Sequence, residues 1–251
     1  MPAFATYPSL ATKSVFITGG ATGIGASLVS HFAAQGSRVG FIDIDGGAAA
    51  ALVAETPGDV TYAYCDVRDI AALQAAITAF EGPDGHIDVL VNNAARDERH
   101  AADDVDVAYW DDRLNINLRP HFFAAQAVRA GMARVGGGSI INFGSIVVQM
   151  AAGNMAGYVT AKAGVQGLTR ALAREFGKDR IRVNCLVPGW VITERQRTLY
   201  WTEDSERAIA EKQCIPDLLE PADLARMALF LAADDSRHCT AQSFIVDGGW
   251  E

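Results

Sequence analysis

The chain of 251 residues contains 21 basic and 30 acidic side chains, which leave a formal net charge of -9. This excess of acidic groups argues against nucleic acid or an anionic membrane surface as a partner. Half of the residues are hydrophobic and 20% are charged, a composition that excludes global disorder and is typical of a compact body. We find neither a basic leader followed by an apolar stretch nor an apolar run long enough to span a bilayer, so we expect a cytoplasmic protein.

Short runs rich in β-branched residues alternate along the chain with alanine-rich stretches of helical period. The runs predicted to be strands are 14–18, 38–44, 60–67, 89–94, 139–145, 181–189 and 243–249. Because they are apolar on both faces and are joined by helices, they predict a parallel sheet that is covered on both sides. We therefore expect one α/β domain over residues 1–251, with a Rossmann-like, doubly wound sheet of seven parallel strands.

The first predicted strand is followed by "TGGATGIG", residues 18–25, which opens the first helix. Glycines allow a tight turn and bring backbone N–H groups close to a pyrophosphate, whose charge also suits a helix N-terminus. We predict that Gly19, Thr22, Gly23, Ile24 and Gly25 bind a dinucleotide.

The second strand ends in "FIDID", where Asp43 stands 18 residues after Gly25. A carboxylate there accepts hydrogen bonds from both hydroxyls of the adenosine ribose and repels a 2'-phosphate. Neither Thr22 nor Ile44, the neighbouring positions, is basic, so nothing there neutralises an extra phosphate. Asp43 and Ile44 therefore predict NAD, rather than NADP, as the cofactor.

The third and fourth strands end in "CDV" and "NNAA". The carboxyl ends of parallel strands share one edge of the sheet, which is where such sheets bind ligands. We expect Asp66 to reach the adenine amino group beside Val67. We expect Asn93 to satisfy loop backbone next to the cofactor, with Ala94 beside it.

The fifth strand ends at Ser145, and Tyr158 and Lys162 follow in "YVTAK". Residues four apart lie on one face of a helix, although such pairs are also common on ordinary helix surfaces. A free tyrosine has a pKa of about 10. An ammonium nearby favours the phenolate and brings that pKa toward neutrality, so Tyr158 becomes a candidate base.

The sequence resembles the short-chain dehydrogenase/reductase family from "TGGATGIG" through "NNAA", "NFGS", "YVTAK" and "VPGW" to "VDGG", over residues 10 to 250. The resemblance implies that Ser145 positions the substrate oxygen and that Tyr158 exchanges its proton. It also implies that Lys162 binds the nicotinamide ribose and lowers the pKa of Tyr158, and that Asn117 supports a water in the proton relay.

The same resemblance assigns the nicotinamide amide to the loop after the sixth strand. The residues implied there are Pro188, Gly189, Val191 and Thr193. Two positions depart from the family pattern: Ala95 and Pro120 stand where glycines are usual, so we expect altered local geometry, since proline removes a helix donor. The family is commonly tetrameric through the helices around 109–132 and 156–177 and the C-terminal segment, which implies a homotetramer.

Residues 190–220 are polar and aromatic and are too long for a routine connection, so we expect a lid over the substrate with helical pieces. "YPSL", "DERH", "EKQC" and "CTAQSFIVDGGW" are similar to bacterial NAD-dependent aldose 1-dehydrogenases of the D-xylose type. That similarity implies oxidation of a cyclic sugar at C1 to the aldonolactone. The candidate substrate contacts are Arg96, Ser145, Gln149, Asn154, Tyr158, Trp190 and Arg195. The polar run "RDERH", residues 96–100, is expected at the mouth of the site, where it either binds sugar hydroxyls or forms a solvated loop.

The sugar itself is left open, because "VVQMAAGNMAG" lacks the Trp and His of the "WHLG"-type segment of the xylose enzymes. Xylose, arabinose, fucose and galactose all remain candidates. A polyol or another secondary alcohol is the alternative within enzymes, and an NAD-binding regulatory protein is the alternative outside them. We predict no metal, since the five histidines share no ligand spacing. We expect the four cysteines, which form no C-x-x-C pair, to be buried and reduced.

Overall fold

The structure is a computed structural model that describes residues 4–81, 85–150 and 152–250. Within these ranges, seven strands form one parallel sheet in the order β3-β2-β1-β4-β5-β6-β7. The strands are β1 (Ser14–Thr18), β2 (Arg38–Asp43), β3 (Val60–Tyr64), β4 (Val89–Asn92), β5 (Gly138–Phe143), β6 (Ile181–Pro188) and β7 (Ser243–Val246). The predicted doubly wound sheet is confirmed.

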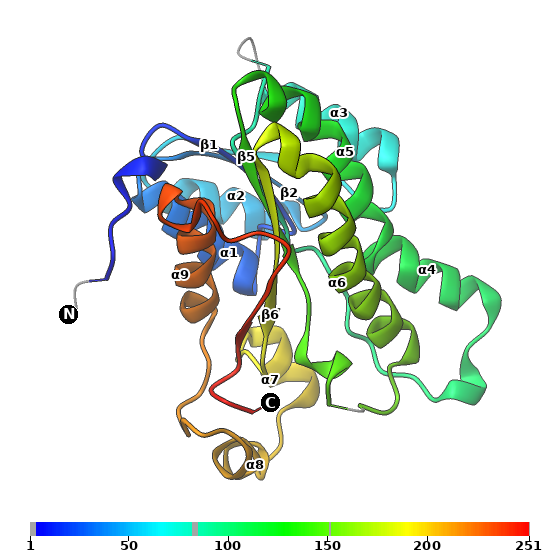
Figure 1. Ribbon diagram of the computed structural model, residues 1–251. Helices are drawn as coiled ribbons and strands as arrows, with labels where there is room; N and C mark the ends of the chain where they lie inside the picture. Colours follow the sequence, from blue (N-terminus) through cyan, green and yellow to red (C-terminus); the bar gives the residue numbers. More distant parts are fainter. Residues whose placement is uncertain (1–3, 82–84, 151, 251) are drawn as a thin grey trace.

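Helices cover both faces of the sheet (Figure 1). One face carries α1 (Gly23–Ala34), α2 (Gly46–Glu55) and α9 (Pro221–Ala232), and the other carries α3 (Ile70–Glu81), α4 (Val107–Asn117), α5 (Arg119–Arg134) and α6 (Ala156–Phe176). The two helical layers pack against the sheet in separate apolar cores, one around Phe32 and Leu224 and one around Ile77 and Val128. Burial on both faces explains why the inner strands read as nearly continuous apolar runs.

The order of the strands reverses between β1 and β4, which lie side by side with Thr18 opposite Asn92. Such a switch point leaves a crevice beyond the carboxyl ends of the strands. Asn92 is in turn opposite Asn142 of β5, so the ends of β1, β4 and β5 meet at one edge. The loops that carry the sequence motifs therefore converge there.

The long helix expected around 109–132 is two helices, α4 and α5, which meet at Leu118. Leu118 leaves helical geometry with φ -132° and ψ -55°. Pro120 then stands within the first turn of α5, where a backbone N–H has no intrahelical partner in any case. Pro120 therefore starts a helix, and the altered local geometry expected here takes the form of the break between α4 and α5.

Residues 190–220, named the lid segment below, contain α7 (Glu194–Tyr200) and α8 (Ser205–Lys212). The two ends of the segment are tied to each other, and its second half is also tied to the C-terminal segment. Val191 forms a β-bridge with Leu219, and the backbone N–H groups of Cys214 and Ile215 donate to the carbonyls of Gly249 and Gly248. The predicted helical pieces are present.

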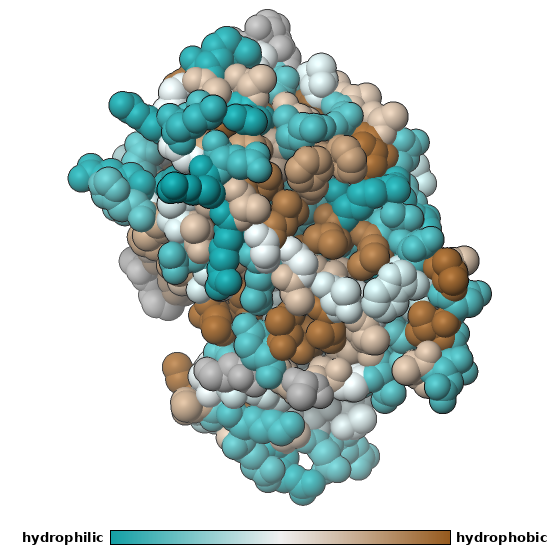
Figure 2. Space-filling model, turned by 45° about the vertical axis from the view of Figure 1, so that its right-hand side comes forward, coloured by the Kyte–Doolittle hydropathy of each residue, from teal (hydrophilic) through white to brown (hydrophobic). Residues whose placement is uncertain are grey.

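On the face formed by α4, α5 and α6, hydrophobic side chains gather between hydrophilic ones (Figure 2). A shallow groove of about 480 Å³ lies there, lined by Leu114, Asn115, Leu118, Arg119, Phe122, Phe123, Gly164 and Leu168. Elsewhere, Cys65 and Cys185 are buried as expected, but Cys214 is exposed, because it lies in the lid segment rather than in a strand. Across the described residues, no helix combines the length and apolar character needed to cross a membrane.

Candidate active site

Side chains at the switch point fix the loops after β1 and β4 to each other. The Thr18 hydroxyl accepts hydrogen bonds from the backbone N–H groups of Asn93 and Ala94, both at 3.1 Å. The Asn93 amide donates to the carbonyls of Thr18 at 3.2 Å and Gly19 at 2.8 Å. Asn93 therefore satisfies loop backbone, as predicted from "NNAA".

The glycine turn has no room for side chains. Gly19 and Gly23 adopt positive φ angles of 68° and 55°, which glycine tolerates without strain. A Cβ atom on Gly25 would overlap the carbonyl oxygen of Gly19, so the turn and the start of α1 are in direct backbone contact. The N-cap residue Thr22 makes no side-chain cap hydrogen bond, which leaves the first N–H groups of α1 available to an anion.

A cavity of about 990 Å³ extends from this turn along the carboxyl edge of the sheet to the lid segment. It is large enough for a dinucleotide together with a small substrate. The predicted cofactor contacts that line it are Gly19, Thr22, Gly23, Ile24, Gly25, Asp43, Ile44, Asp66, Val67, Asn93, Ala94, Tyr158, Pro188, Gly189, Val191 and Thr193. A backbone cradle at one end and buried proton-exchanging groups at the other fit a nicotinamide dinucleotide.

Two carboxylates mark the end of the cavity beside β2 and β3. Asp43 accepts hydrogen bonds from the backbone N–H groups of Ala21, Ile44 and Asp45, so its charge is fixed at the tip of β2. Asp66 binds Arg68, whose guanidinium also pairs with Asp112, and these contacts hold the pKa of Asp66 below its usual range. The Arg68 guanidinium is thus held between two acids.

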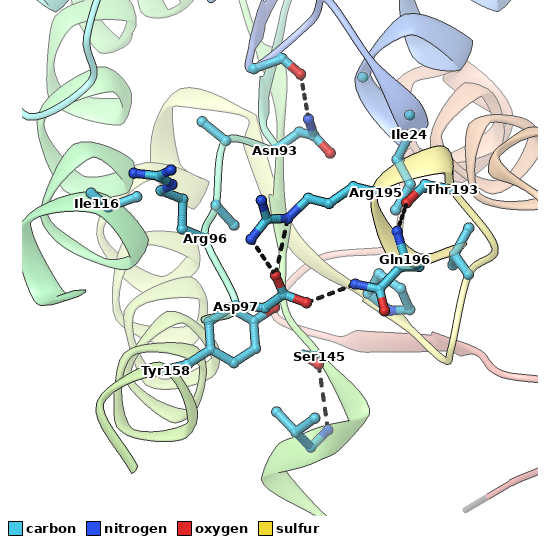
Figure 3. A pocket seen from close by; sticks show the side chains of 18 of the residues that line it. Ile24, Asn93, Arg96, Asp97, Ile116, Ser145, Tyr158, Thr193, Arg195 and Gln196 are labelled. Carbon is cyan, nitrogen blue, oxygen red and sulfur yellow. Dashed lines mark hydrogen bonds and ion pairs between the residues drawn. The ribbon is translucent and has the colours of Figure 1, made fainter. Parts of the chain in front are cut away.

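Ser145, Tyr158 and Lys162 lie together at the other end. Ser145 and Tyr158 line the cavity (Figure 3). Lys162 is 1% exposed and lies behind the tyrosine, with Nζ 5.7 Å from the centroid of the phenol ring. Its ammonium donates to the Phe143 carbonyl at 2.7 Å, so the end of β5 orients the lysine.

The protonation of this pair differs from the expectation. Burial raises the pKa of Tyr158, the charge of Asp97 raises it further, and the hydrogen bond with Ser145 lowers it in part. Burial lowers the pKa of Lys162 to about 8. The predicted fall in the pKa of Tyr158 is therefore not seen, because desolvation outweighs the favourable contacts of the phenolate.

Asn117, the last residue of α4, is fully buried and does not line the cavity. Its amide oxygen accepts from the backbone N–H of Arg96 at 2.8 Å, and its amide nitrogen donates to the carbonyls of Arg96 and Arg113 at 3.1 Å and 3.0 Å. In this structure Asn117 holds the loop that follows β4.

Most predicted substrate contacts surround the same part of the cavity. Arg96, Asn154, Trp190 and Arg195 line it together with Ser145 and Tyr158, whereas Gln149 does not. Gln149 instead caps the short 3-10 turn Ile146–Val148, a turn that "VVQM" does not reveal.

Asp97 and Arg99 also line the cavity, and both belong to the polar run 96–100, which the sequence marks as a candidate for binding sugar hydroxyls. Lys212 and Trp250 are among the cavity residues that were not predicted. Lys212 stacks its ammonium on the Trp250 ring, 5.1 Å from the centroid. That contact joins the lid segment to the C-terminal segment, and no local pattern predicts it.

The fold and the site together define a nicotinamide-dependent oxidoreductase. A sequence profile of the family described as enoyl-(acyl carrier protein) reductase matches residues 19–251. The chain belongs to the short-chain dehydrogenase/reductase family, whose dehydrogenases use a nicotinamide cofactor.

Relatives of known name cover nearly the whole chain. D-xylose 1-dehydrogenase of Caulobacter vibrioides is 47% identical over 249 residues, 98% of each chain. A probable galactose dehydrogenase of Rhizobium meliloti is 45% identical over 97% of this chain and 96% of its own. D-threitol dehydrogenase of Mycolicibacterium smegmatis is 36% identical over 95% and 92%. Among solved structures, a putative gluconate dehydrogenase from Agrobacterium tumefaciens superposes with a TM-score of 0.92 at 26% identity, over 98% of each chain.

Proposed function

We propose that this protein is an NAD-dependent aldose 1-dehydrogenase, which oxidises C1 of a cyclic sugar to the aldonolactone. The observation that supports this most directly is the position of the Tyr158 phenol, beside Ser145 in a cavity whose opposite end fits a dinucleotide. Arg96, Asp97, Asn154 and Arg195 surround the same space with hydrogen-bonding groups, as a sugar requires. The names of two relatives, a xylose and a galactose dehydrogenase, agree with this proposal.

In the proposed reaction, Ser145 donates a hydrogen bond to the anomeric oxygen and orients it toward Tyr158. Tyr158, as the phenolate, takes the proton of the anomeric hydroxyl while the C1–H bond breaks and a C1=O double bond forms. NAD supplies the acceptor for the hydride that leaves C1. The positive charge of Lys162 favours the phenolate.

We propose NAD over NADP because of the charges near β2. Asp43 is fixed at the end of that strand, and Arg68, which also lines the cavity, is paired with Asp66 and Asp112. A 2'-phosphate would meet the Asp43 carboxylate there, and the charge of the nearby Arg68 is already offset by two acids.

The remaining expectations from the sequence stay part of the proposal. The lid segment is proposed to cover the substrate, because Trp190, Arg195 and Gln196 line the cavity from that side. A homotetramer is proposed, since an apolar groove lies on α4, α5 and α6. A cytoplasmic location is proposed on the sequence composition alone.

The test is a substrate screen with the purified protein. NADH or NADPH formation is followed by ultraviolet absorbance with aldoses, with polyols such as threitol and with simple secondary alcohols, and Tyr158→Phe serves as the control. We expect an aldose to reduce NAD, and we expect the variant to lose about 10²-fold or more of kcat/KM. If only polyols or simple alcohols react, the sugar assignment is wrong. If NAD binds but nothing is oxidised, the protein is a binding module.

A further inference from the structure

Asp97 occupies a place in the cavity that neither the dinucleotide cradle nor the catalytic residues account for. It follows β4 in the loop after Asn93, and it lines the cavity together with Ser145 and Tyr158. Its side chain is only 25% exposed. Its charge acts on both Tyr158 and Lys162, so the carboxylate lies near both residues.

The lid segment holds this carboxylate in place (Figure 3). The Arg195 guanidinium donates to Oδ1 from Nη2 at 3.2 Å and from Nε at 3.4 Å. Gln196 donates from Nε2 to Oδ2 at 2.7 Å. The Gln196 amide is itself oriented, because its oxygen accepts the indole N–H of Trp190 at 3.0 Å. The chain therefore fixes the direction in which Asp97 presents its oxygens.

These contacts leave hydrogen-bonding capacity on both partners. A carboxylate has about four lone-pair positions, and a guanidinium has five N–H donors. Oδ2 accepts only from Gln196 among the described residues, and Nη1 of Arg195 has no described partner. An acceptor and a donor side by side suit hydroxyl groups, which both donate and accept. An apolar substrate in this place would remove water from the Asp97–Arg195 ion pair and leave its remaining donor and acceptor positions without hydrogen bonds, which is costly.

The charges around Asp97 are mixed rather than of one sign. Arg96, Arg99 and Arg195 line this part of the cavity together with Asp97 and Glu194. Several of the charges are internally paired, as in the Arg195–Asp97 ion pair. Such a surrounding does not select for a strongly charged substrate, and it favours a neutral one with several hydroxyls.

We propose that Asp97 is a substrate-binding residue whose carboxylate accepts a hydrogen bond from a sugar hydroxyl other than the one at C1. Arg195 and Gln196 act as positioning residues for it. The inference rests on the proposed aldose 1-dehydrogenase function and specifies what the site selects: a neutral, hydroxyl-rich ring rather than a simple secondary alcohol.

The experiment compares Asp97→Asn and Asp97→Ser with Asp103→Asn, which removes an exposed carboxylate from the same connection. The substrates are the best aldose from the screen and its monodeoxy forms. We expect both Asp97 variants to raise KM for the aldose at least about tenfold, as for loss of a hydrogen bond to a charged group, with a smaller change in kcat. The dissociation constant for NAD, measured by tryptophan fluorescence, is expected to stay within about twofold. Asp103→Asn is expected to behave as the wild type.

The deoxy sugars assign the contact. For one deoxy sugar, we expect the wild-type KM to rise by about the same factor as the Asp97 substitutions raise the KM for the intact sugar. For that deoxy sugar, we expect the Asp97 variants to show no further rise in KM. If the wild type oxidises no aldose, the proposed function is wrong and this inference fails with it. If the wild type oxidises an aldose but both variants keep KM within about twofold, this inference alone is wrong.

Arg195→Gln provides a second test if the Asp97 variants do not fold, as checked by circular dichroism. This change removes the hydrogen bonds that Arg195 donates to Oδ1 of Asp97, and the Arg195 side chain that it alters is half-exposed. We expect a higher KM for the intact aldose and an unchanged KM for the deoxy form that lacks the contacted hydroxyl. An unchanged KM for the intact aldose would overturn the inference.

Discussion

At the scale of single residues, Tyr158, the proposed catalytic base, is buried in a way that disfavours its charged form. Desolvation and the charge of Asp97 raise the pKa of Tyr158. Oxidation needs the phenolate as base, so kcat/KM for aldose oxidation is expected to rise with pH from neutrality into the alkaline range. The reverse reduction, which needs the protonated phenol, is expected to fall over the same range. Initial rates in both directions check this, and a flat oxidation profile would contradict it.

His121 gives a second residue-scale prediction, this time for stability. It is 2% exposed, neither ring nitrogen has a hydrogen-bond partner among the described residues, and burial together with the charge of Lys162 lowers its pKa well below the ordinary value. Below about pH 6.5 the unfolded chain binds a proton that the folded protein does not. Stability is therefore expected to fall as the pH drops below that value.

Urea unfolding at about pH 5 and about pH 7.5 measures this loss. His121→Leu is expected to reduce the difference in free energy of unfolding between the two conditions, because it removes the group that binds the proton. His238→Gln is the control, since His238 is exposed and this variant should keep the wild-type difference. An equal difference in wild type and His121→Leu would show that other groups determine the acid response.

At the scale of secondary-structure elements, the strands and the glycine turn could be predicted because their signals are local. Apolar runs, helical period and "TGGATGIG" each lie within about one element. The break between α4 and α5 was missed, because its backbone change falls on Leu118, a residue that ordinarily favours helix. The contacts of Asp97 with Gln196 and of Trp250 with Lys212 were missed for a different reason, since the partners lie about a hundred and about forty residues apart in the sequence, and only packing brings them together.

The contact between the glycine turn and α1 can be tested with two alanine substitutions. Gly25→Ala would place a methyl group against the Gly19 carbonyl, so the turn has to move and we expect a lower melting temperature. Because the moved turn no longer presents its backbone N–H groups correctly, we also expect NAD to bind at least about tenfold more weakly. Gly167→Ala is the control, because a Cβ there meets nothing within 4 Å in the middle of α6. It is expected to stabilise the protein by about 0.5–1 kcal/mol through helix propensity. Unimpaired NAD binding by Gly25→Ala would refute this account of the turn.

At the scale of the whole molecule, the groove on α4, α5 and α6 is the feature that bears on assembly. Phe122 is 39% exposed beside Phe123, and its ring meets the Phe123 ring edge-on at 5.2 Å between centroids. Exposed aromatic rings next to leucines on a helical face are typical of protein interfaces. The active-site cavity lies at the carboxyl edge of the sheet and shares no lining residue with this groove. Assembly and catalysis can therefore be separated by mutation.

The proposed homotetramer predicts that Phe122→Asp dissociates the protein into smaller species, because each subunit would bury a carboxylate in an apolar contact. Val135→Asp is the matched control, since Val135 is also an exposed apolar residue, 47% exposed, at the end of α5 and outside the groove. Light scattering after size exclusion gives the mass of each variant. A monomeric wild type would refute the proposed tetramer, and a Phe122→Asp variant that keeps the wild-type mass would place the interface elsewhere. Because the groove and the cavity are separate, a dissociated variant that still binds NAD would show that each subunit forms its dinucleotide site alone.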